Sequence, residues 1–429
     1  MTEEELLALL HHHSRAQGVP GAAVGILTGD TATVACHGVA DIRRGEALTP
    51  ASRFGVGSLT KSMCATVIVR LADAGRLSLD APVAAHVPEL EGAAWAEAAT
   101  VRDLLANRSG LPLRAGLEFG FGEHETGGGD VLAAFAAAVA REDPTRIAWS
   151  YTNAGWCVAG RLIETAAGES WEDAMRRWLL EPAGMSESES ASDPRPPHRV
   201  TGHEPGPGGA VPVEPLEARA YAPAGTSLVS TVGDLLRFAA MHLRDPALEA
   251  MRAAQPSPAI HGWFDGWCLG WARFDAGGGS VWGWDSVLPG ERAALRLLPE
   301  HGAAVVVMTN GEQGRALCRP VLEELLASFG VVLPPLRLQP DPRAAGDLER
   351  FAGVYGWPDR RVEVRAAGTH LVVSAEDGDA EARPLDGRAF VVDATDPDNP
   401  AITFGELDQS GRPRALYLML WALPRIDGE

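Results

Sequence analysis

A serine and a lysine three residues apart lie in the stretch VGSLTKSMCATVIVRLA, which runs from Val56 to Ala72. The apolar residues after Lys61 recur near the helical period, so a helix beginning at Ser58 would carry both side chains on one face. Side chains at that spacing lie about 5–6 Å apart at Cβ. Two interpretations follow. Ser58 caps the helix beside a solvated lysine, or it is a nucleophile with a base beside it.

Two further groups of residues bear on this choice. WSYTNAGW places Tyr151 and Asn153 in a loop just before a predicted helix, and VWGWDSVLPG places Trp284, Asp285 and Ser286 on a predicted strand. A serine hydroxyl is a poor nucleophile until a neighbouring group takes its proton, and a lysine amine or a tyrosine phenolate can take it. Alone, the Tyr-x-Asn sequence would favour an ordinary turn. Together, the three motifs favour a catalytic serine.

The order and spacing of these motifs resemble the serine β-lactamase and penicillin-binding protein superfamily, especially its class C-like and esterase branch. ANRSGLP resembles the family's His-Thr-Ser-Gly-Leu-Pro turn, with Asn107 and Arg108 in the first two places. APAGTSLVSTVGDLLRFA resembles its glycine turn and following helix, and LPEHGAAVVVMTNG resembles its last long strand. The resemblance covers roughly residues 5 to 330 of the chain.

This resemblance implies a role for each motif residue. Ser58 attacks the substrate carbonyl, Lys61 and Tyr151 share the role of base, and Tyr151 is also the acid for the leaving group. Which of the two is the acylation base stays open, as it does in related enzymes. The backbone N–H groups of Ser58 and Val287 form the oxyanion hole. Asn153 forms hydrogen bonds with Lys61 and with a substrate amide.

The third motif departs from the family, which usually has Lys-Thr-Gly or His-x-Gly. Alignment on the following strand places Trp284, Asp285 and Ser286 there, and these residues are predicted to bind substrate together with Asn107. An indole supplies no positive charge for a substrate carboxylate, but its N–H and flat face suit an uncharged or aromatic acyl group. The motif therefore argues against a β-lactamase or a D-alanine carboxypeptidase and favours an esterase. The alternative is a structural tryptophan with the motif shifted by a residue or two.

Tryptophans cluster around this motif. The cluster consists of Trp263, Trp267, Trp271, Trp282 and Trp284. Such a group of aromatic side chains lines an apolar acyl pocket or belongs to the core, and the sequence leaves both interpretations open.

Composition excludes several classes of protein. The 429 residues carry a net charge of -20, which disfavours nucleic acid and anionic membranes as partners. No glycine-rich phosphate loop precedes a helix, so neither a nucleotide nor another organic cofactor is expected. The five cysteines are widely spaced, which argues against a disulfide framework or a structural zinc site, and Cys64 is expected in the core. The N-terminal segment lacks the basic start and apolar run of a signal peptide, and a cytoplasmic location is expected.

The pattern of elements predicts an α+β protein of two domains. Early strands, a long helical region, late strands and a closing helix predict an antiparallel sheet flanked by helices over residues 1–330. Residues 331–346 are Pro-rich and predict a linker. Short strands separated by turns predict a small all-β, barrel-like domain over residues 347–429, which resembles the lipocalin-like module of some family members.

These observations predict a serine acyl-enzyme hydrolase that acts on an ester or amide of a small-molecule or peptide-derived acyl group. Neither a metal nor another cofactor is expected. Two alternatives stay open. One is an acyltransferase or peptide-cyclising thioesterase of bacterial natural-product biosynthesis, whose substrate could be bound to a carrier protein. The other is a sensor that is acylated by a β-lactam or acyl ligand and does not turn over.

Overall fold

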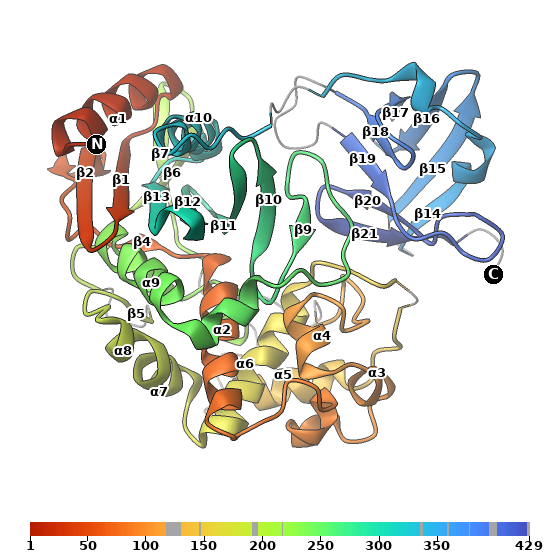
Figure 1. Ribbon diagram of the computed structural model, residues 1–429, viewed down its shortest axis with the longest axis horizontal. Coiled ribbons are helices and arrows are strands. Elements are labelled where there is room, and N and C mark those ends of the chain that lie inside the picture. The colour runs from red at the N-terminus through yellow and green to blue at the C-terminus, as the bar shows by residue number, and fades with distance from the viewer. Residues whose placement is uncertain are drawn as a thin grey trace.

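The computed structural model describes residues 1–116, 130–145, 147–190, 196–216, 218–334, 338–357, 360–376, 378–393 and 401–426. An antiparallel sheet of eight strands forms its centre (Figure 1). Within this sheet β1 lies beside β13, so the two ends of the first part of the chain meet at the centre of the sheet. The strands of this sheet, in spatial order, are β3 (Glu46–Ala47), β2 (Thr31–Asp41), β1 (Gly21–Thr28), β13 (Ala303–Thr309), β12 (Glu291–Leu298), β11 (Gly279–Leu288), β10 (Ala272–Ala276) and β9 (Gly266–Trp267).

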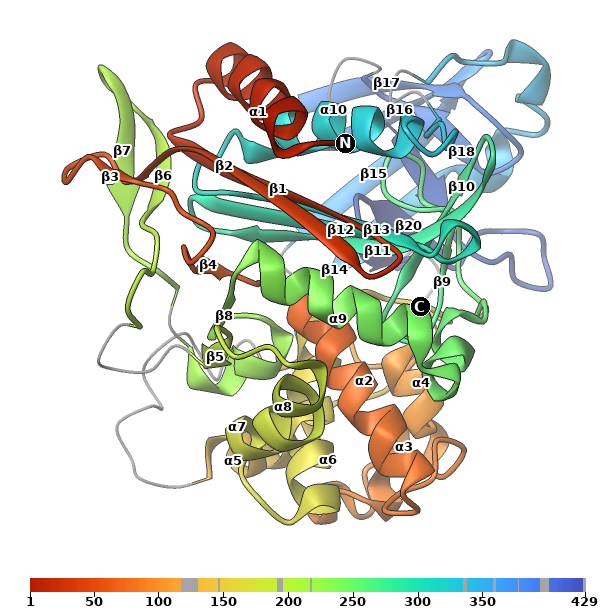
Figure 2. The same ribbon diagram turned by 60° about the vertical axis from the view of Figure 1, so that its left-hand side comes forward.

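Helices cover both faces of this sheet (Figure 2). α1 and α10 lie on one face, whereas α9 and the first turns of α2 lie on the other. Every residue of β13 is buried, as expected for a continuous apolar run covered on both sides. The predicted α+β fold is therefore confirmed. The α-helices are α1 (Glu3–Gln17), α2 (Leu59–Asp73), α3 (Ala94–Ala98), α4 (Val101–Leu105), α5 (Val131–Val139), α6 (Asn153–Ala167), α7 (Trp171–Met175), α8 (Glu181–Ala183), α9 (Val232–Arg244) and α10 (Gly314–Ala327).

Two small sheets and several short helical turns connect these elements. One sheet joins β4 (Phe54–Gly55), β8 (Leu228–Ser230) and β5 (Glu189–Ser190), and the other is the hairpin of β6 (Gly202–Gly206) and β7 (Gly209–Val213). The short turns are η1 (Val83–Ala85), η2 (Pro88–Leu90), the π-helical η4 (Arg176–Leu180), η5 (Arg219–Ala224), η6 (Pro246–Arg252), η7 (Pro299–His301), η8 (Pro342–Ala344) and η9 (Glu349–Phe351).

The C-terminal part forms a near-closed antiparallel barrel of eight strands. An isolated bridge joins Tyr355 in its first strand to Arg425, the residue directly after its last strand. The predicted all-β, barrel-like arrangement is confirmed. The lipocalin-like resemblance and the boundaries at 331–346 stay predictions, and residues 335–337 lie outside the described residues. The strands are β14 (Gly353–Trp357), β15 (Arg360–Ala367), β16 (His370–Ala375), β17 (Gly378–Pro384), β18 (Ala389–Val391), β19 (Ala401–Phe404), β20 (Ala415–Leu418) and β21 (Trp421–Pro424).

The barrel packs beside β9 and β10 (Figure 1). Tyr417 donates a hydrogen bond from its hydroxyl to the carbonyl of Trp149 at 2.8 Å, and the rings of these residues are 6.0 Å apart. His261 lies 3.0 Å from Asp386 across the same junction. Tyr417 therefore joins the core of the first part of the chain, where it contacts the segment that leads into Tyr151.

Neither a membrane span nor a disulfide occurs in the part of the chain that the structure describes. No helix there is sufficiently long and apolar to cross a bilayer. All five cysteines are free, and Cys64 is buried in the core as predicted.

A histidine is enclosed in the core where α9 meets α2. His242 Nε2 lies 2.9 Å from the hydroxyl of Thr66, and its ring packs edge-on against Phe238 and Trp271. Thr66 donates its own proton to the carbonyl of Ser62, so His242 is the donor to Thr66. Burial, together with the nearby charge of Arg252, lowers the pKa of His242 from 6.5 to about 3.

This histidine is expected to destabilise the protein in mild acid. The unfolded chain takes up a proton at His242 near pH 6.5, whereas the folded protein does so only near pH 3, so stability falls as the pH drops below 6.5. Between pH 7.5 and 5.0 the loss is about 2 kcal/mol. Urea denaturation of the wild type and of His242→Gln at both pH values measures it, because the neutral amide lacks this linkage. An equal loss in both proteins would contradict the assignment.

Candidate active site

Ser58 lies at the start of α2, in a turn where two glycines allow close backbone contact. Gly57 has a left-handed φ of 54°, and a Cβ there would overlap the hydroxyl of Ser286. Gly225 has a φ of 130°, and a Cβ there would overlap the backbone of Gly57. The half-buried Ser58 hydroxyl forms no capping hydrogen bond with the helix. The structure therefore does not support the interpretation of Ser58 as a helix cap.

Lys61 is completely buried one turn into α2. Its Nζ donates to Ser58 Oγ at 3.0 Å and to the carbonyl of Ala224 at 2.5 Å. These two hydrogen bonds compensate for the free energy that it costs to bury the Lys61 amino group away from water. They also aim the Lys61 nitrogen at the serine hydroxyl. A solvated lysine, which was the other part of the first interpretation, is excluded by this burial.

Tyr151 lies next to this pair, directly before α6. Thr152 caps α6 by accepting a hydrogen bond from the backbone N–H of Ala154, which fixes the preceding turn. The Lys61 nitrogen lies 5.2 Å from the centre of the Tyr151 ring. Trp284 Nε1 donates to the Tyr151 hydroxyl oxygen at 3.2 Å. The phenol oxygen of Tyr151 is thus an acceptor from Trp284.

Some tryptophans of the cluster surround Tyr151. The Trp267 ring lies 5.8 Å from Tyr151 and 4.8 Å from Trp284. Trp271 instead contacts His242 in the core, and Trp282 donates to a backbone carbonyl at 3.1 Å. The cluster is therefore divided. Two tryptophans form an aromatic wall beside Tyr151, and the others pack elsewhere.

Alternation along β11 separates the residues of the third motif. Trp284 contacts Tyr151 and Ser286 lies beside Gly57, so both face α2. Successive side chains of a strand point to opposite faces. Asp285 accordingly lies on the other face, where it pairs with Arg296 at 2.7 Å. The prediction that Asp285 contacts substrate beside Trp284 is therefore corrected, because its carboxylate faces away from Ser58.

The pairing of β11 also exposes a strand edge. β10 pairs with β11 only from Gly279 to Gly283. Within the described residues, the segment from Trp284 to Leu288 has no neighbouring strand on that side. Val287 lies on this segment, and its side chain is 53% exposed. Its backbone is thus near the surface, between Ser286 and the turn into β12.

The remaining predicted residues have different surroundings. Asn107 is 3% exposed, and its side-chain oxygen accepts a hydrogen bond from Trp156 Nε1 of α6 at 3.0 Å. Asn153 is exposed at the first turn of α6, and among the described residues its side chain forms no hydrogen bond with Lys61. Arg108 pairs with Asp103 and donates to the carbonyl of Pro256.

Sequence reasoning did not single out three residues that form this site. Ala224 supplies the second acceptor for Lys61, and Gly225 permits its approach. Glu291 accepts the backbone N–H of Gly55 at 2.8 Å, three residues before Ser58. The APAGTSLVS glycine turn was a signal for the first two. No local sequence pattern pointed to Glu291, because its partner Gly55 lies 236 positions away.

Comparison with known proteins identifies the family of this chain. A model of the β-lactamase family matches residues 6–326. The chain belongs to the β-lactamase family. It is 31% identical over 364 residues to penicillin-binding protein 4 of Amycolatopsis lactamdurans, which covers 79% of this chain and 93% of that protein. It is 29% identical over 191 residues to a D-aminopeptidase of Cereibacter sphaeroides, which covers 43% of this chain and 36% of that protein.

Similarity to solved structures extends to the barrel. SurE superposes with a TM-score of 0.81 and 28% identity over 99% of both chains. A class C β-lactamase has a TM-score of 0.64 and 20% identity over 76% of this chain and 96% of its own, which shows the shared fold. The family membership makes this protein a β-lactamase-family hydrolase. Its described residues contain no group of three or more histidine, cysteine or acidic side chains arranged to hold a metal ion.

Proposed function

We propose that this protein is a serine acyl-enzyme hydrolase that acts on an ester or amide, with Ser58 as nucleophile. The hydrogen bond of 3.0 Å between Lys61 Nζ and Ser58 Oγ is the observation that carries this proposal. Lys61 or the phenolate of Tyr151 takes the proton of Ser58 as its oxygen attacks the carbonyl. A covalent acyl-Ser58 forms when the leaving group takes a proton from Tyr151. Water then releases the acyl group.

Two backbone N–H groups would stabilise the oxyanion of the tetrahedral intermediate, those of Ser58 and Val287. Both belong to fixed elements, the start of α2 and the strand β11. Donors that are already in place when charge develops account for much of the rate gain in acyl transfer. The unpaired edge of β11 also leaves backbone groups available to an extended substrate.

The substrate class follows from the aromatic wall and the relatives. Trp284 stands where the family usually has lysine or histidine, and its ring packs with that of Trp267 beside Tyr151. This place in the third motif therefore supplies no cation, which suits an uncharged acyl group. A structure of SurE with D-Leu is 27% identical over 99% of this chain, and a D-aminopeptidase is among the relatives. We therefore infer an amino-acyl or peptidyl donor whose reacting residue is apolar and of D configuration.

Acyl transfer is the second candidate reaction. An amine or alcohol that replaces water as the acceptor of the acyl group would make the protein an acyltransferase. Intact mass spectrometry after incubation with an activated ester and an amine separates the possibilities. Free acid identifies a hydrolase, an amide product identifies a transferase, and a persistent adduct identifies a sensor that does not turn over.

Covalent labelling tests the nucleophile directly. A fluorophosphonate probe is expected to add one adduct, on the peptide that carries Ser58. Peptide mapping must distinguish Ser58 from Ser62, whose hydroxyl is buried against the carbonyl of Gly270. Burial raises the pKa of the nearby Cys64 thiol to about 12, so a reactive thiolate is not expected there. An adduct on Ser62, Ser150 or Cys64 would overturn the assignment of Ser58.

Trp284 is expected to remove the preference of the family for a free carboxylate beside the scissile bond. An indole cannot pair with a carboxylate, and burying an unpaired charge is costly. In the wild type, a p-nitroanilide with a free carboxylate should have no higher kcat/KM than its neutral analogue. Trp284→His should shift the ratio toward the carboxylate substrate. A tenfold preference of the wild type for the carboxylate substrate would show that another cation binds the carboxylate. Arg108 would be the first residue to test, and it already pairs with Asp103.

A further inference from the structure

Glu291 is a buried carboxylate that contacts the turn of the proposed nucleophile. Its side chain is 3% exposed, and one oxygen accepts the backbone N–H of Gly55 at 2.8 Å. On the other side of Gly55, the N–H of Val56 donates to the carbonyl of Leu228 at 2.9 Å. The strand that leads to Ser58 is thus fixed on one side by β8 and on the other by the Glu291 side chain.

Glu291 also belongs to the element that carries the second proposed oxyanion donor. It is the first residue of β12 and the direct partner of Leu288 in the turn from β11. Val287 precedes Leu288 in β11. The carboxylate of Glu291 therefore joins two segments that are far apart in the sequence, the turn that presents the N–H of Ser58 and the strand that presents the N–H of Val287.

Arg199 fixes the carboxylate of Glu291 by a two-pronged ion pair. Its two terminal nitrogens lie 2.8 and 2.5 Å from the two Glu291 oxygens. Arg199 also donates to the carbonyl of Val200 at 3.1 Å. Both side chains of the pair are nearly inaccessible to solvent, 7% for Arg199 and 3% for Glu291, so neither can move into water without breaking the pair.

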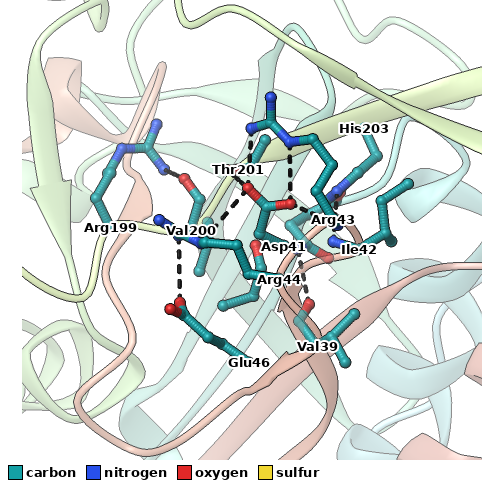
Figure 3. A network of polar contacts seen from close by, with 12 residues as sticks. Val39, Asp41, Ile42, Arg43, Arg44, Glu46, Arg199, Val200, Thr201 and His203 are labelled. Carbon is teal, nitrogen blue, oxygen red and sulfur yellow. Dashed lines mark hydrogen bonds and ion pairs between the residues drawn. The ribbon is translucent and has the colours of Figure 1, made fainter.

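The segment that carries Arg199 is itself anchored by a polar network (Figure 3). Asp41, at the end of β2, accepts hydrogen bonds from the Thr201 hydroxyl at 2.9 Å and from Arg43. His203 contacts the backbone N–H of Ile42 at 3.3 Å. Arg199 is therefore supported from the edge of the main sheet, outside the site.

We propose that Glu291 is a positioning residue that sets the distance between the two oxyanion donors, and that Arg199 holds it in place. This inference rests on the proposed function, because it assumes that Ser58 and Val287 supply those donors. Backbone donors act only where the oxyanion develops. An error of about 1 Å in such a site can lower the rate about a hundredfold. The hydrogen bond from Gly55 to the Glu291 carboxylate, which Arg199 fixes by an ion pair, restricts that error.

The double variant Glu291→Leu/Arg199→Met tests this role separately from stability. Replacing a buried ion pair by apolar residues of similar volume often preserves stability, whereas removing one partner does not. The N–H of Gly55 nevertheless loses its acceptor. With p-nitrophenyl acetate, we expect kcat to fall at least tenfold while KM changes less than threefold. The inhibition constant of phenylboronic acid, whose serine adduct is tetrahedral, should rise at least tenfold.

A second variant keeps the test decisive if the double variant does not fold. Glu291→Gln retains an acceptor for Gly55 but loses the charge that pairs with Arg199, so we expect kcat to fall at least threefold at unchanged KM. Asp41→Asn is the matched control, because it alters a buried carboxylate of the adjoining network without touching Gly55. It should lower the melting temperature and leave kcat within twofold.

The outcomes separate this inference from the proposed function. If the folded Glu291 variants retain kcat and boronate affinity within twofold of the wild type, or lose no more than Asp41→Asn does, Glu291 is not a positioning residue. Fluorophosphonate labelling of Ser58 in the wild type shows that the nucleophile assignment survives such a result. Labelling of another residue in the wild type would instead overturn the proposed function, and this inference with it.

Discussion

Ser58→Ala is expected to lower kcat/KM by roughly a thousandfold or more, since it removes the group to which the acyl chain is attached. Covalent labelling by a fluorophosphonate should disappear as well. The fold should persist, because the Ser58 hydroxyl does not cap α2. Among the described residues, this hydroxyl accepts a hydrogen bond from Lys61. Steady-state kinetics with an activated ester, combined with circular dichroism, measures both effects.

Ser62→Ala is the matched control for this variant. Ser62 lies one helical turn further along α2 and donates to the carbonyl of Gly270 at 2.5 Å. Its replacement removes the same hydroxyl from the same helix and leaves that carbonyl without its donor, so stability should fall by about 1–3 kcal/mol. Activity per folded molecule should stay near the wild type. If Ser58→Ala retains activity within tenfold of the wild type, Ser58 is not the nucleophile.

Tyr151→Phe is expected to have the next largest effect, a loss of about 10²–10⁴-fold in kcat. The substitution preserves the ring that packs against Trp267 and Trp284 but removes the oxygen that accepts from Trp284. Proton transfer to the leaving group is then lost. Substrates with a good leaving group, such as p-nitrophenyl esters, should be affected less than anilides, since they need little protonation.

The comparison of esters and anilides makes this test specific to acid catalysis. Tyr355→Phe serves as control, because it also removes a buried hydroxyl, here one that donates to the carbonyl of Phe351 at 2.9 Å within the barrel. It should change the stability of the protein but not the ratio of ester to anilide turnover. Equal losses for both substrate types in Tyr151→Phe would assign Tyr151 to packing or binding.

Strong local patterns predicted most of the fold. Small and β-branched residues in the early segments, and the order of early strands, helices and late strands, predicted one antiparallel sheet, and the all-β pattern of the last part predicted a barrel. The spacing of Ser58 and Lys61 predicted their common helical face, since the helical period fixes that relation within one turn. Family resemblance then led to Tyr151 and Trp284, which the structure brings together.

Strand parity explains why the third motif was only partly predicted. Residues next to one another in β11 must face opposite ways, so Trp284 and Asp285 could not both lie beside Tyr151. The sequence fixes this alternation but not which face meets α2. That choice depends on how the whole sheet packs against the helices. Asp285 consequently pairs with Arg296 on the opposite face.

The sequence by itself thus determined the elements, their order and the pair formed by Ser58 and Lys61, because these depend on contacts within a few residues. The tertiary structure alone decided which distant groups complete the site. Ala224 reaches Lys61 from 163 positions away, and Glu291 reaches Gly55 from 236 positions away. Such contacts depend on the closure of long stretches of chain around a common core. No local periodicity or propensity encodes that closure, so these partners became visible only when the chain was folded.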